Sequence, residues 1–304
     1  MSNLEGLKGC GTALITPFLA NGTVDEKALV SMINWQIQEG IHFLVPCGTT
    51  GESPTLKHEE HLAIVDITAR TAARRVPVLA GAGGNDTHKV MRLIEELKQL
   101  GVDGILSVSP YYNRPTQEGI YQHYRALADS TDLPIIVYNV PGRTGSNILP
   151  DTLVRLAEIP NIAGVKEASG DISQIGEICT RAPDRFRIFS GDDSLTLPTI
   201  ALGGHGIISV ASNEAPRMMA QFAEACLEGR WEEARNWNRK LYPLMKVNFV
   251  ESSPIPVKAA LAMMGKIQEV YRLPLVRISE GARAKVATAL ANLNLISAGT
   301  EVKG

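Results

Sequence analysis

The segment Pro134–Glu167 reads PIIVYNVPGRTGSNILPDTLVRLAEIPNIAGVKE. Its two ends, Pro134–Asn139 and Ile162–Glu167, are short apolar runs of the kind found in buried strands. Between them, apolar residues recur at helical spacing over Pro150–Glu158. A strand, a helix and a second strand in this order predict a βαβ unit with parallel strands.

The same alternation occurs eight times between Gly11 and about Val210. Eight such units with short connections predict an α/β fold of the closed (β/α)8 type, a TIM barrel. A doubly wound open sheet is the alternative, but no GxGxxG motif follows the first strand. The helices include Lys57–Arg74, Asp86–Leu100, Gln117–Ala128 and Pro150–Glu158, and the expected strands are Thr12–Pro17, His42–Cys47, Pro77–Ala82, Gly104–Ser109, Pro134–Asn139, Ile162–Glu167, Phe186–Ser190 and Gly206–Val210.

Helical patterns alone follow Ser212. Pro216–Leu227 is expected to be the last helix of the barrel, and three further helices follow it. We therefore predict a barrel over residues 1–228 and a C-terminal all-helical extension over residues 229–304. The helices of this extension are expected at Trp231–Leu244, Pro256–Met264 and Ser279–Leu293.

The composition favours small-molecule chemistry. The 304 residues carry a formal net charge of −2, which argues against a nucleic-acid partner. No apolar run approaches the length of a membrane span, and the N-terminus lacks the pattern of a signal peptide, so we expect a cytoplasmic protein without a membrane partner. The four cysteines have no CxxC spacing and are expected to be reduced: Cys10, Cys47, Cys179 and Cys226.

Lys166 is anomalous because it lies inside the apolar run Ile162–Glu167. An ammonium group in a buried strand must be paired, neutralised or used in chemistry. Burial lowers the pKa of a lysine and so makes its amine available as a nucleophile. The structural alternative is an ion pair, for which the adjacent Glu167 is the nearest candidate.

Other reactive side chains follow the strands that would meet Lys166 at the mouth of the barrel. Tyr138 is the candidate acid and base for the dehydration that produces an imine. Thr49 and Tyr112 are candidates to extend this group into a relay of hydroxyls. This convergence favours catalysis over an ion pair for Lys166. Two further groups are suited to substrate carboxylates, namely Thr50 with the backbone N–H groups of its glycine-rich turn, and the guanidinium of Arg143.

Competing signals for metals or nucleotides are weaker. His58 and His61 are three residues apart, whereas the HExxH zinc motif needs four. Asp192 and Asp193 lack a third carboxylate suited to Mg²⁺. Gly81–Gly84 lacks the Lys-Ser/Thr of a P-loop. We expect no metal and no cofactor.

Taken together, these motifs resemble the dihydrodipicolinate synthase family, also called 4-hydroxy-tetrahydrodipicolinate synthases, within the lysine-dependent pyruvate aldolases. The resemblance runs from about Gly9 to Pro256. The matching segments are Gly48–Glu52 (GTTGE), Pro110–Pro115 (PYYNRP), Tyr138–Thr144 (YNVPGRT), Gly164–Asp171 (GVKEASGD), Gly191–Asp193 (GDD) and Gly203–Val210 (GGHGIISV).

The resemblance implies condensation of pyruvate with L-aspartate-4-semialdehyde in the diaminopimelate route to lysine. Lys166 would form the pyruvate imine, and Tyr138 would donate and accept protons. Thr49 and Tyr112 would complete the relay, with Tyr112 reaching in from a neighbouring subunit of a homotetramer built from two dimers. The expected substrate-binding residues are Thr50, Arg143, Ile208 through its backbone, Gly191 and Asp192.

Two other functions are weighed against this one. Aldolases and lyases that act on sialic acid or other sugar acids resemble the chain at the lysine and the tyrosine, but they generally lack an arginine after the YNVP-type turn. Arg143 therefore favours a short dicarboxylic product. A catalytically silent barrel would leave Thr49, Tyr112, Tyr138 and Lys166 unexplained.

Lysine-inhibited members of the family carry an allosteric pocket near the tight dimer interface. Lys89 stands where those members typically have a glutamate, so the acceptor for the ammonium group of the effector is replaced by a like charge. We therefore expect weak or absent feedback by L-lysine. The pattern of the pocket is otherwise matched by Ser53, His58, His61, Asn85 and Tyr111.

Overall fold

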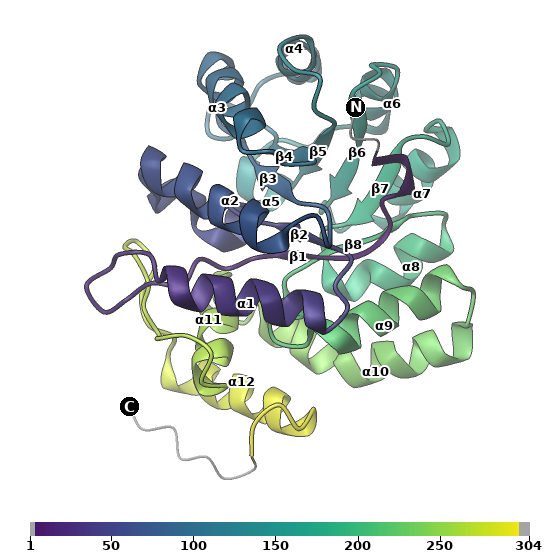
Figure 1. Ribbon diagram of the computed structural model, residues 1–304. Coiled ribbons are helices and arrows are strands. Elements are labelled where there is room, and N and C mark those ends of the chain that lie inside the picture. The colour runs from purple at the N-terminus through teal and green to yellow at the C-terminus, as the bar shows by residue number, and fades with distance from the viewer. Residues whose placement is uncertain (1–3, 298–304) are drawn as a thin grey trace.

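Eight strands run parallel to one another and are surrounded by helices (Figure 1). The computed structural model describes residues 4–297. The strands are β1 (Gly9–Ala13), β2 (Phe43–Val45), β3 (Leu79–Gly81), β4 (Gly104–Val108), β5 (Ile135–Asn139), β6 (Ile162–Glu167), β7 (Arg187–Ser190) and β8 (Gly206–Ser209).

The sheet is closed into a barrel. Its strand order is β2-β1-β8-β7-β6-β5-β4-β3, and a parallel bridge between Leu44 and Val78 joins the two ends. At this closure Leu44 N donates to Pro77 O at 2.9 Å, and Gly81 N donates to Pro46 O at 2.9 Å. The predicted (β/α)8 barrel is confirmed, and the open sheet is excluded.

The predicted bounds of the first strand are wrong. The strand is Gly9–Ala13, not Thr12–Pro17, because Gly9–Thr12 pair with Gly206–Ser209 of β8. A Cβ atom on Gly11 would lie 2.1 Å from the ring of Phe43, so close packing inside the barrel requires glycine there. Strand propensity favours the β-branched residues that come later in the sequence. It does not reveal where close packing requires a glycine. The other seven strands agree with the prediction to within two residues at each end.

The helices form a ring outside the barrel. Asp86 and Thr116 cap two of these helices, since Asp86 accepts hydrogen bonds from His88 N and Lys89 N and Thr116 accepts one from Gly119 N. The helices of eight or more residues up to the end of the barrel are α1 (Glu26–Gln38), α2 (His58–Ala72), α3 (Thr87–Gln99), α4 (Gln117–Asp129), α6 (Pro150–Ala157), α7 (Ile172–Arg181) and α9 (Pro216–Leu227), with the shorter α5 (Pro141–Thr144) and α8 (Thr196–Ala201) between them.

Three more helices follow, namely α10 (Trp231–Val247), α11 (Ile255–Met263) and α12 (Glu280–Asn292). Helix α9 packs on β1 and β8 of the barrel, whereas α10 packs on α9, and α12 packs on α10 and α11. In Figure 1 these last helices lie along one side of the barrel, near α1. We therefore propose the division expected from the sequence, a barrel over residues 1–228 and a helical extension over residues 229–304.

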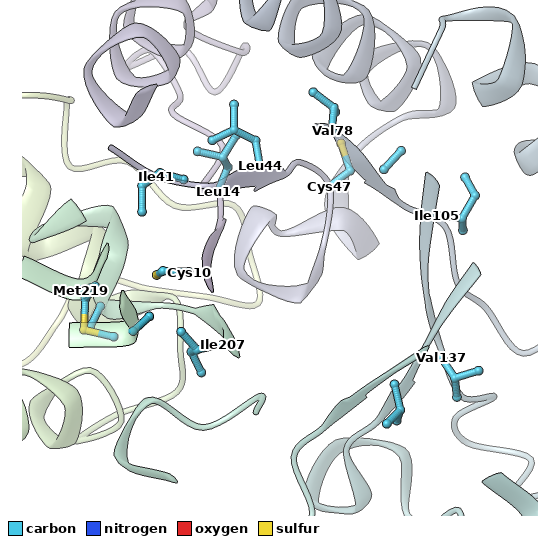
Figure 2. Close-up of a cluster of buried hydrophobic side chains, with 14 of the residues drawn as sticks. Cys10, Leu14, Ile41, Leu44, Cys47, Val78, Ile105, Val137, Ile207 and Met219 are labelled. Atoms are coloured by element: carbon cyan, nitrogen blue, oxygen red, sulfur yellow. The ribbon is translucent and has the colours of Figure 1, made fainter. Parts of the chain in front are cut away.

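Alternate residues of each strand enter different apolar layers, as the period of two requires. On β5, Ile136 and Tyr138 belong to the layer inside the barrel, and Ile135 and Val137 belong to the layer between sheet and helices. Figure 2 shows part of this outer layer, including Val137 and Ile105. The alternation decides which strand residues can reach the central site.

Candidate active site

Lys166 lies near the C-terminal end of β6, and only 4% of it is exposed. The preceding Val165 packs in the outer layer, so Lys166 faces the inside of the barrel. Burial lowers the pKa of its ammonium group to about 8, while the Asp193 carboxylate opposes the shift and Arg143 adds to it. Near neutral pH, the neutral amine is therefore far more populated in Lys166 than in an ordinary lysine.

The ion pair between Lys166 and Glu167 is not formed. Glu167 points away from the barrel interior, where Oε2 accepts from Asn139 Nδ2 at 2.9 Å and from Gln174 Nε2 at 3.2 Å. Its Oε1 accepts from Ser169 N at 2.6 Å. Among residues 4–297, Lys166 takes part in no salt bridge. The structural alternative weighed for Lys166 therefore fails.

Tyr138 lies beside Lys166. The two residues are paired in register on β5 and β6, and Lys166 Nζ lies 4.3 Å from the centroid of the Tyr138 ring. Burial raises the pKa of the Tyr138 hydroxyl to about 12, although Arg143 and a hydrogen bond with the Thr49 side chain oppose this. Tyr138 thus stays protonated and can donate a proton next to the amine.

A second buried lysine serves as an internal comparison. Lys258 on α11 is fully buried, but its Nζ forms an ion pair with Glu52. Burial lowers the pKa of Lys258 too, and the Glu52 carboxylate opposes that change. An amine held in an ion pair is not free to attack a carbonyl group, so Lys166 is the candidate nucleophile of the two. The sequence reasoning missed Lys258, although its position in the apolar helix Ile255–Met263 was a usable signal.

A cavity of about 470 Å³ opens beside these groups. Its lining includes Thr49, which follows β2, and Tyr138 and Arg143, which lie on and directly after β5. Lys166 is not part of the lining and lies behind the Tyr138 ring. Arg143 belongs to α5, directly after β5, and its Nη2 donates to Ser253 O at 3.0 Å. The cavity thus combines a proton donor with a cation suited to a carboxylate.

The remaining predicted substrate-binding residues lie on or directly after other strands of the barrel. Thr50 is buried in the short 3-10 turn Thr49–Gly51, and Ile208 is buried in the inner layer on β8. Gly191 lies against Lys166, because a Cβ atom there would be 3.1 Å from Lys166 Cε. Asp192 Oδ1 caps the next turn by accepting from Ser194 N at 2.8 Å.

Tyr112 is not brought to the cavity within one chain. It is 88% exposed and has a left-handed backbone, with φ of 73°. A tyrosine this exposed makes little packing contact within its own chain. Its predicted part in the relay therefore requires a second copy of the chain.

The residues predicted for an allosteric pocket are divided between two cavities. A second cavity of about 510 Å³ is lined by His58, Asn85, Lys89 and Tyr111, among others. Ser53 and His61 line the first cavity instead, to which His58 and Tyr111 also contribute. His58 Nε2 lies 2.6 Å from Glu96 Oε2, and the exposed Lys89 Nζ lies 4.0 Å from Asp86 Oδ2.

Other reactive candidates are held in structural roles. Cys47 is buried, and burial raises the pKa of its thiol well above the ordinary value, so it is not an activated nucleophile. His61 Nε2 is hydrogen-bonded to Gly81 O at 2.9 Å. Asp193 accepts from Val210 N at 3.2 Å and Ala211 N at 3.0 Å. In the described part of the chain, no group of three or more His, Cys, Asp or Glu residues could hold a metal ion.

A (β/α)8 barrel that holds a buried lysine without an ion-pair partner beside a tyrosine, at the ends of adjacent strands, defines the class of lysine-dependent aldolases. Comparison with known proteins gives the family. The model of the dihydrodipicolinate synthetase family matches residues 6–293, and the chain belongs to this family.

Individual relatives agree. The chain is 51% identical to the 4-hydroxy-tetrahydrodipicolinate synthase of Acidobacterium capsulatum, over 95% of this chain and 97% of the relative. The crystal structure of dihydrodipicolinate synthase from Aquifex aeolicus superposes with a TM-score of 0.93 at 44% identity, covering 95% of this chain and 99% of that one. A monomeric dihydrodipicolinate synthase variant superposes with a TM-score of 0.95 at 42% identity, covering 97% and 99%. None of the helices within residues 4–297 has the length and apolar character needed to cross a membrane.

Proposed function

We propose that the chain is a 4-hydroxy-tetrahydrodipicolinate synthase that condenses pyruvate with L-aspartate-4-semialdehyde through an imine on Lys166. The observation that carries the proposal is the buried amine of Lys166, free of any salt bridge in the described chain and 4.3 Å from the ring centroid of Tyr138. Membership of the family supports the choice of the two substrates. The reaction is a step of lysine biosynthesis, and we place the protein in the cytoplasm.

The first half of the reaction makes a nucleophile from pyruvate. The neutral Lys166 amine adds to the ketone carbon, and the resulting carbinolamine loses water to give a protonated imine. Tyr138 gives a proton to the departing hydroxyl group and takes one back, with Thr49 as its hydrogen-bonding partner. Loss of a proton from the pyruvate methyl group then yields the enamine.

The second half forms and releases the product. The enamine carbon attacks the aldehyde carbon of the semialdehyde, whose oxygen becomes the hydroxyl of the product. The substrate amine then adds to the imine carbon and displaces Lys166, which regenerates the free enzyme. We assign Thr50, the backbone of Ile208, Gly191 and Asp192 to pyruvate and the imine, and Arg143 to the carboxylate of the semialdehyde.

Reductive trapping tests the proposal. Borohydride added in the presence of pyruvate should reduce the imine and leave a pyruvate-derived mass on Lys166, located by peptide mass spectrometry. Turnover of aspartate semialdehyde should exceed turnover of sialic acid and other sugar acids. No adduct in the wild-type protein would refute the imine mechanism. A preference for sugar acids would identify the chain as an aldolase or lyase of sugar acids instead.

Arg143→Ala should weaken the use of the semialdehyde far more than the use of pyruvate. A charged hydrogen bond of this kind contributes about 1.5–3 kcal/mol, so kcat/KM for the semialdehyde should fall about 10- to 100-fold. Arg143→Lys should recover only part of this loss, because an ammonium group cannot make the planar, two-point contact. Steady-state kinetics with each substrate varied in turn would measure the difference. A rise in the KM for pyruvate alone would contradict the assignment.

We propose a homotetramer built as a dimer of dimers, in which Tyr112 completes the hydroxyl relay of the neighbouring subunit. Its 88% exposure in one chain and its position in the strand-four loop support this assignment. A mixed oligomer of Tyr112→Phe and Lys166→Ala chains tests it. If Tyr112 acts across the interface, such a mixture regains activity that neither homo-oligomer has, and a mass in solution of four chains would support the tetramer.

We propose an allosteric role for Ser53, His58, His61, Asn85 and Tyr111 that does not respond strongly to L-lysine. The exposed ammonium of Lys89 in the second cavity, which His58, Asn85 and Tyr111 also line, repels the side-chain ammonium of a lysine effector. Wild-type enzyme should therefore keep most of its activity at L-lysine concentrations that inhibit sensitive relatives. Lys89→Glu should raise the sensitivity, as measured by inhibition curves on both proteins. Tight inhibition of the wild type would contradict this role for Lys89.

A further inference from the structure

A buried ion pair connects the helical extension to the active-site turn. Glu52 follows the turn Thr49–Gly51, and its carboxylate pairs with Lys258 Nζ on α11. Both side chains are 0% exposed. Lys258 Nζ also lies 4.2 Å from the centroid of the Phe18 ring. No substrate contact is assigned to either residue, so the pair needs another explanation.

The backbone at Glu52 shows what the pair holds. Glu52 adopts a left-handed backbone conformation, with φ of 55°, which residues other than glycine rarely adopt. It lies between the two 3-10 turns Thr49–Gly51 and Ser53–Thr55. Glu52 N donates to Thr49 O at 3.1 Å, and Gly51 N donates to Gly48 O at 3.0 Å. The side-chain anchor therefore acts directly on the residue that ends the turn bearing Thr49.

Arg272 of the extension reinforces the same junction. Its backbone N donates to Glu52 Oε2 at 3.4 Å, and its guanidinium donates to both carboxylate oxygens of Glu60, at 2.7 and 2.6 Å. Its Nη1 also donates to Thr55 O at 2.9 Å. The extension thus contacts Glu52 and the segment that follows it, up to Glu60. A separate contact, Arg143 Nη2 to Ser253 O at 3.0 Å, joins the segment before α11 to another residue of the cavity lining.

Buried ion pairs seldom add net stability, because removing two charges from water offsets their attraction. Their best-attested use is to fix one arrangement among several. We infer that Glu52 and Lys258 are positioning residues through which the helical extension fixes the Thr49–Gly51 turn against Tyr138 and the pyruvate site. The inference rests on the proposed function for its catalytic consequence. It gives the helical extension a role in the reaction.

The main test replaces both charges together, so that neither is left buried alone. In Glu52→Met with Lys258→Met, flexible apolar side chains fill the volume but remove the tether. We expect a folded protein whose kcat falls about 10- to 100-fold, as small displacements of catalytic groups produce. The KM for pyruvate should rise because Thr50 shares the turn, whereas the KM for the semialdehyde should stay within about threefold.

Three comparisons separate positioning from general damage. Lys98→Met with Asp132→Asn removes an exposed ion pair, 2.7 Å long, and should change neither kcat nor KM. Glu52→Gln keeps the length and an oxygen that can accept from Lys258 Nζ, so the turn stays tethered and kcat should remain within about threefold of the wild-type value. The buried charge of Lys258 then lacks its counter-charge, so the free energy of unfolding should fall. Should the double variant fail to fold, Glu52→Asp takes its place in the kinetic test. A carboxylate shortened by one methylene can reach Lys258 only by displacing the turn. This variant should show the same rise in the KM for pyruvate.

Hydrogen exchange gives a readout that does not depend on the reaction. The amides of Gly51 and Glu52 should exchange faster in the double variant, while those of β5 and β6 should not change. Unchanged exchange at the turn together with wild-type kcat and KM values would overturn the inference. If the wild-type protein formed no pyruvate adduct, the proposed function would fail, and exchange at the turn would still decide whether the tether exists.

Discussion

Lys166→Ala should lower kcat/KM by about four orders of magnitude or more, the scale on which loss of a covalent nucleophile acts. No other described lysine combines burial with freedom from a salt bridge next to Tyr138. The alternative buried amine, Lys258, is held by Glu52. Borohydride trapping with pyruvate should leave the variant without the adduct that the wild type carries.

Two control variants separate loss of the nucleophile from loss of a positive charge. Lys98→Ala removes an exposed lysine and should keep both activity and adduct. Lys166→Arg keeps a cation of similar reach but no free amine, because a guanidinium is not deprotonated in proteins, so it should be as inactive as Lys166→Ala. Activity of Lys166→Arg near the wild-type level would show that the charge, not imine formation, is what matters.

The pH dependence of trapping follows from the position of Lys166. Burial lowers the pKa of Lys166 from 10.5 to about 8, so the reactive neutral amine is half populated near pH 8. Below that pH, the neutral fraction falls about tenfold for each unit. The initial rate of adduct formation should therefore rise with pH and level off above about 8. A half-maximal rate near 10.5 would mean that Lys166 is hydrated and not buried during the reaction.

The barrel and its central lysine could be read from the sequence because they depend on local patterns. The run Ile162–Glu167 matches β6 at both ends, and a lysine in such a run is visible without any tertiary information. The first strand could not be placed in this way. Its bounds depend on the packing of Gly11 against Phe43 and on pairing with a strand almost two hundred residues later.

Long-range charge pairing was also hidden from the sequence. Glu52 and Lys258 are 206 residues apart, and neither local period nor spacing relates them. The sequence similarly offered Glu167 as a partner for Lys166, since the two are adjacent. The alternation of a strand sends adjacent side chains to opposite faces, and Glu167 accordingly binds Asn139 and Gln174 outside the barrel. Adjacency in a strand is thus poor grounds for pairing.

Tyr138→Phe should lower kcat by about 10²- to 10⁴-fold, the range over which a positioned acid or base contributes. The Tyr138 hydroxyl is the proposed proton donor beside Lys166, and it is hydrogen-bonded to Thr49. Its pKa of about 12 keeps it protonated before it gives its proton to the proposed carbinolamine. The ring remains in the variant, so the packing around Lys166 Nζ should persist. Imine formation should slow without being abolished, because the nucleophile is intact.

The single-turnover rate of trapping with pyruvate separates this role from a structural one. The lost hydrogen bond to Thr49 should cost only about 1 kcal/mol of unfolding free energy, far less than the loss in rate requires. Thr49→Val breaks the same hydrogen bond but keeps the Tyr138 hydroxyl, so it should lose less activity than Tyr138→Phe. Tyr121→Phe, on the outer helix α4, should match the wild type. If Thr49→Val and Tyr138→Phe were equally impaired, the hydrogen bond and not the proton of Tyr138 would be what catalysis requires.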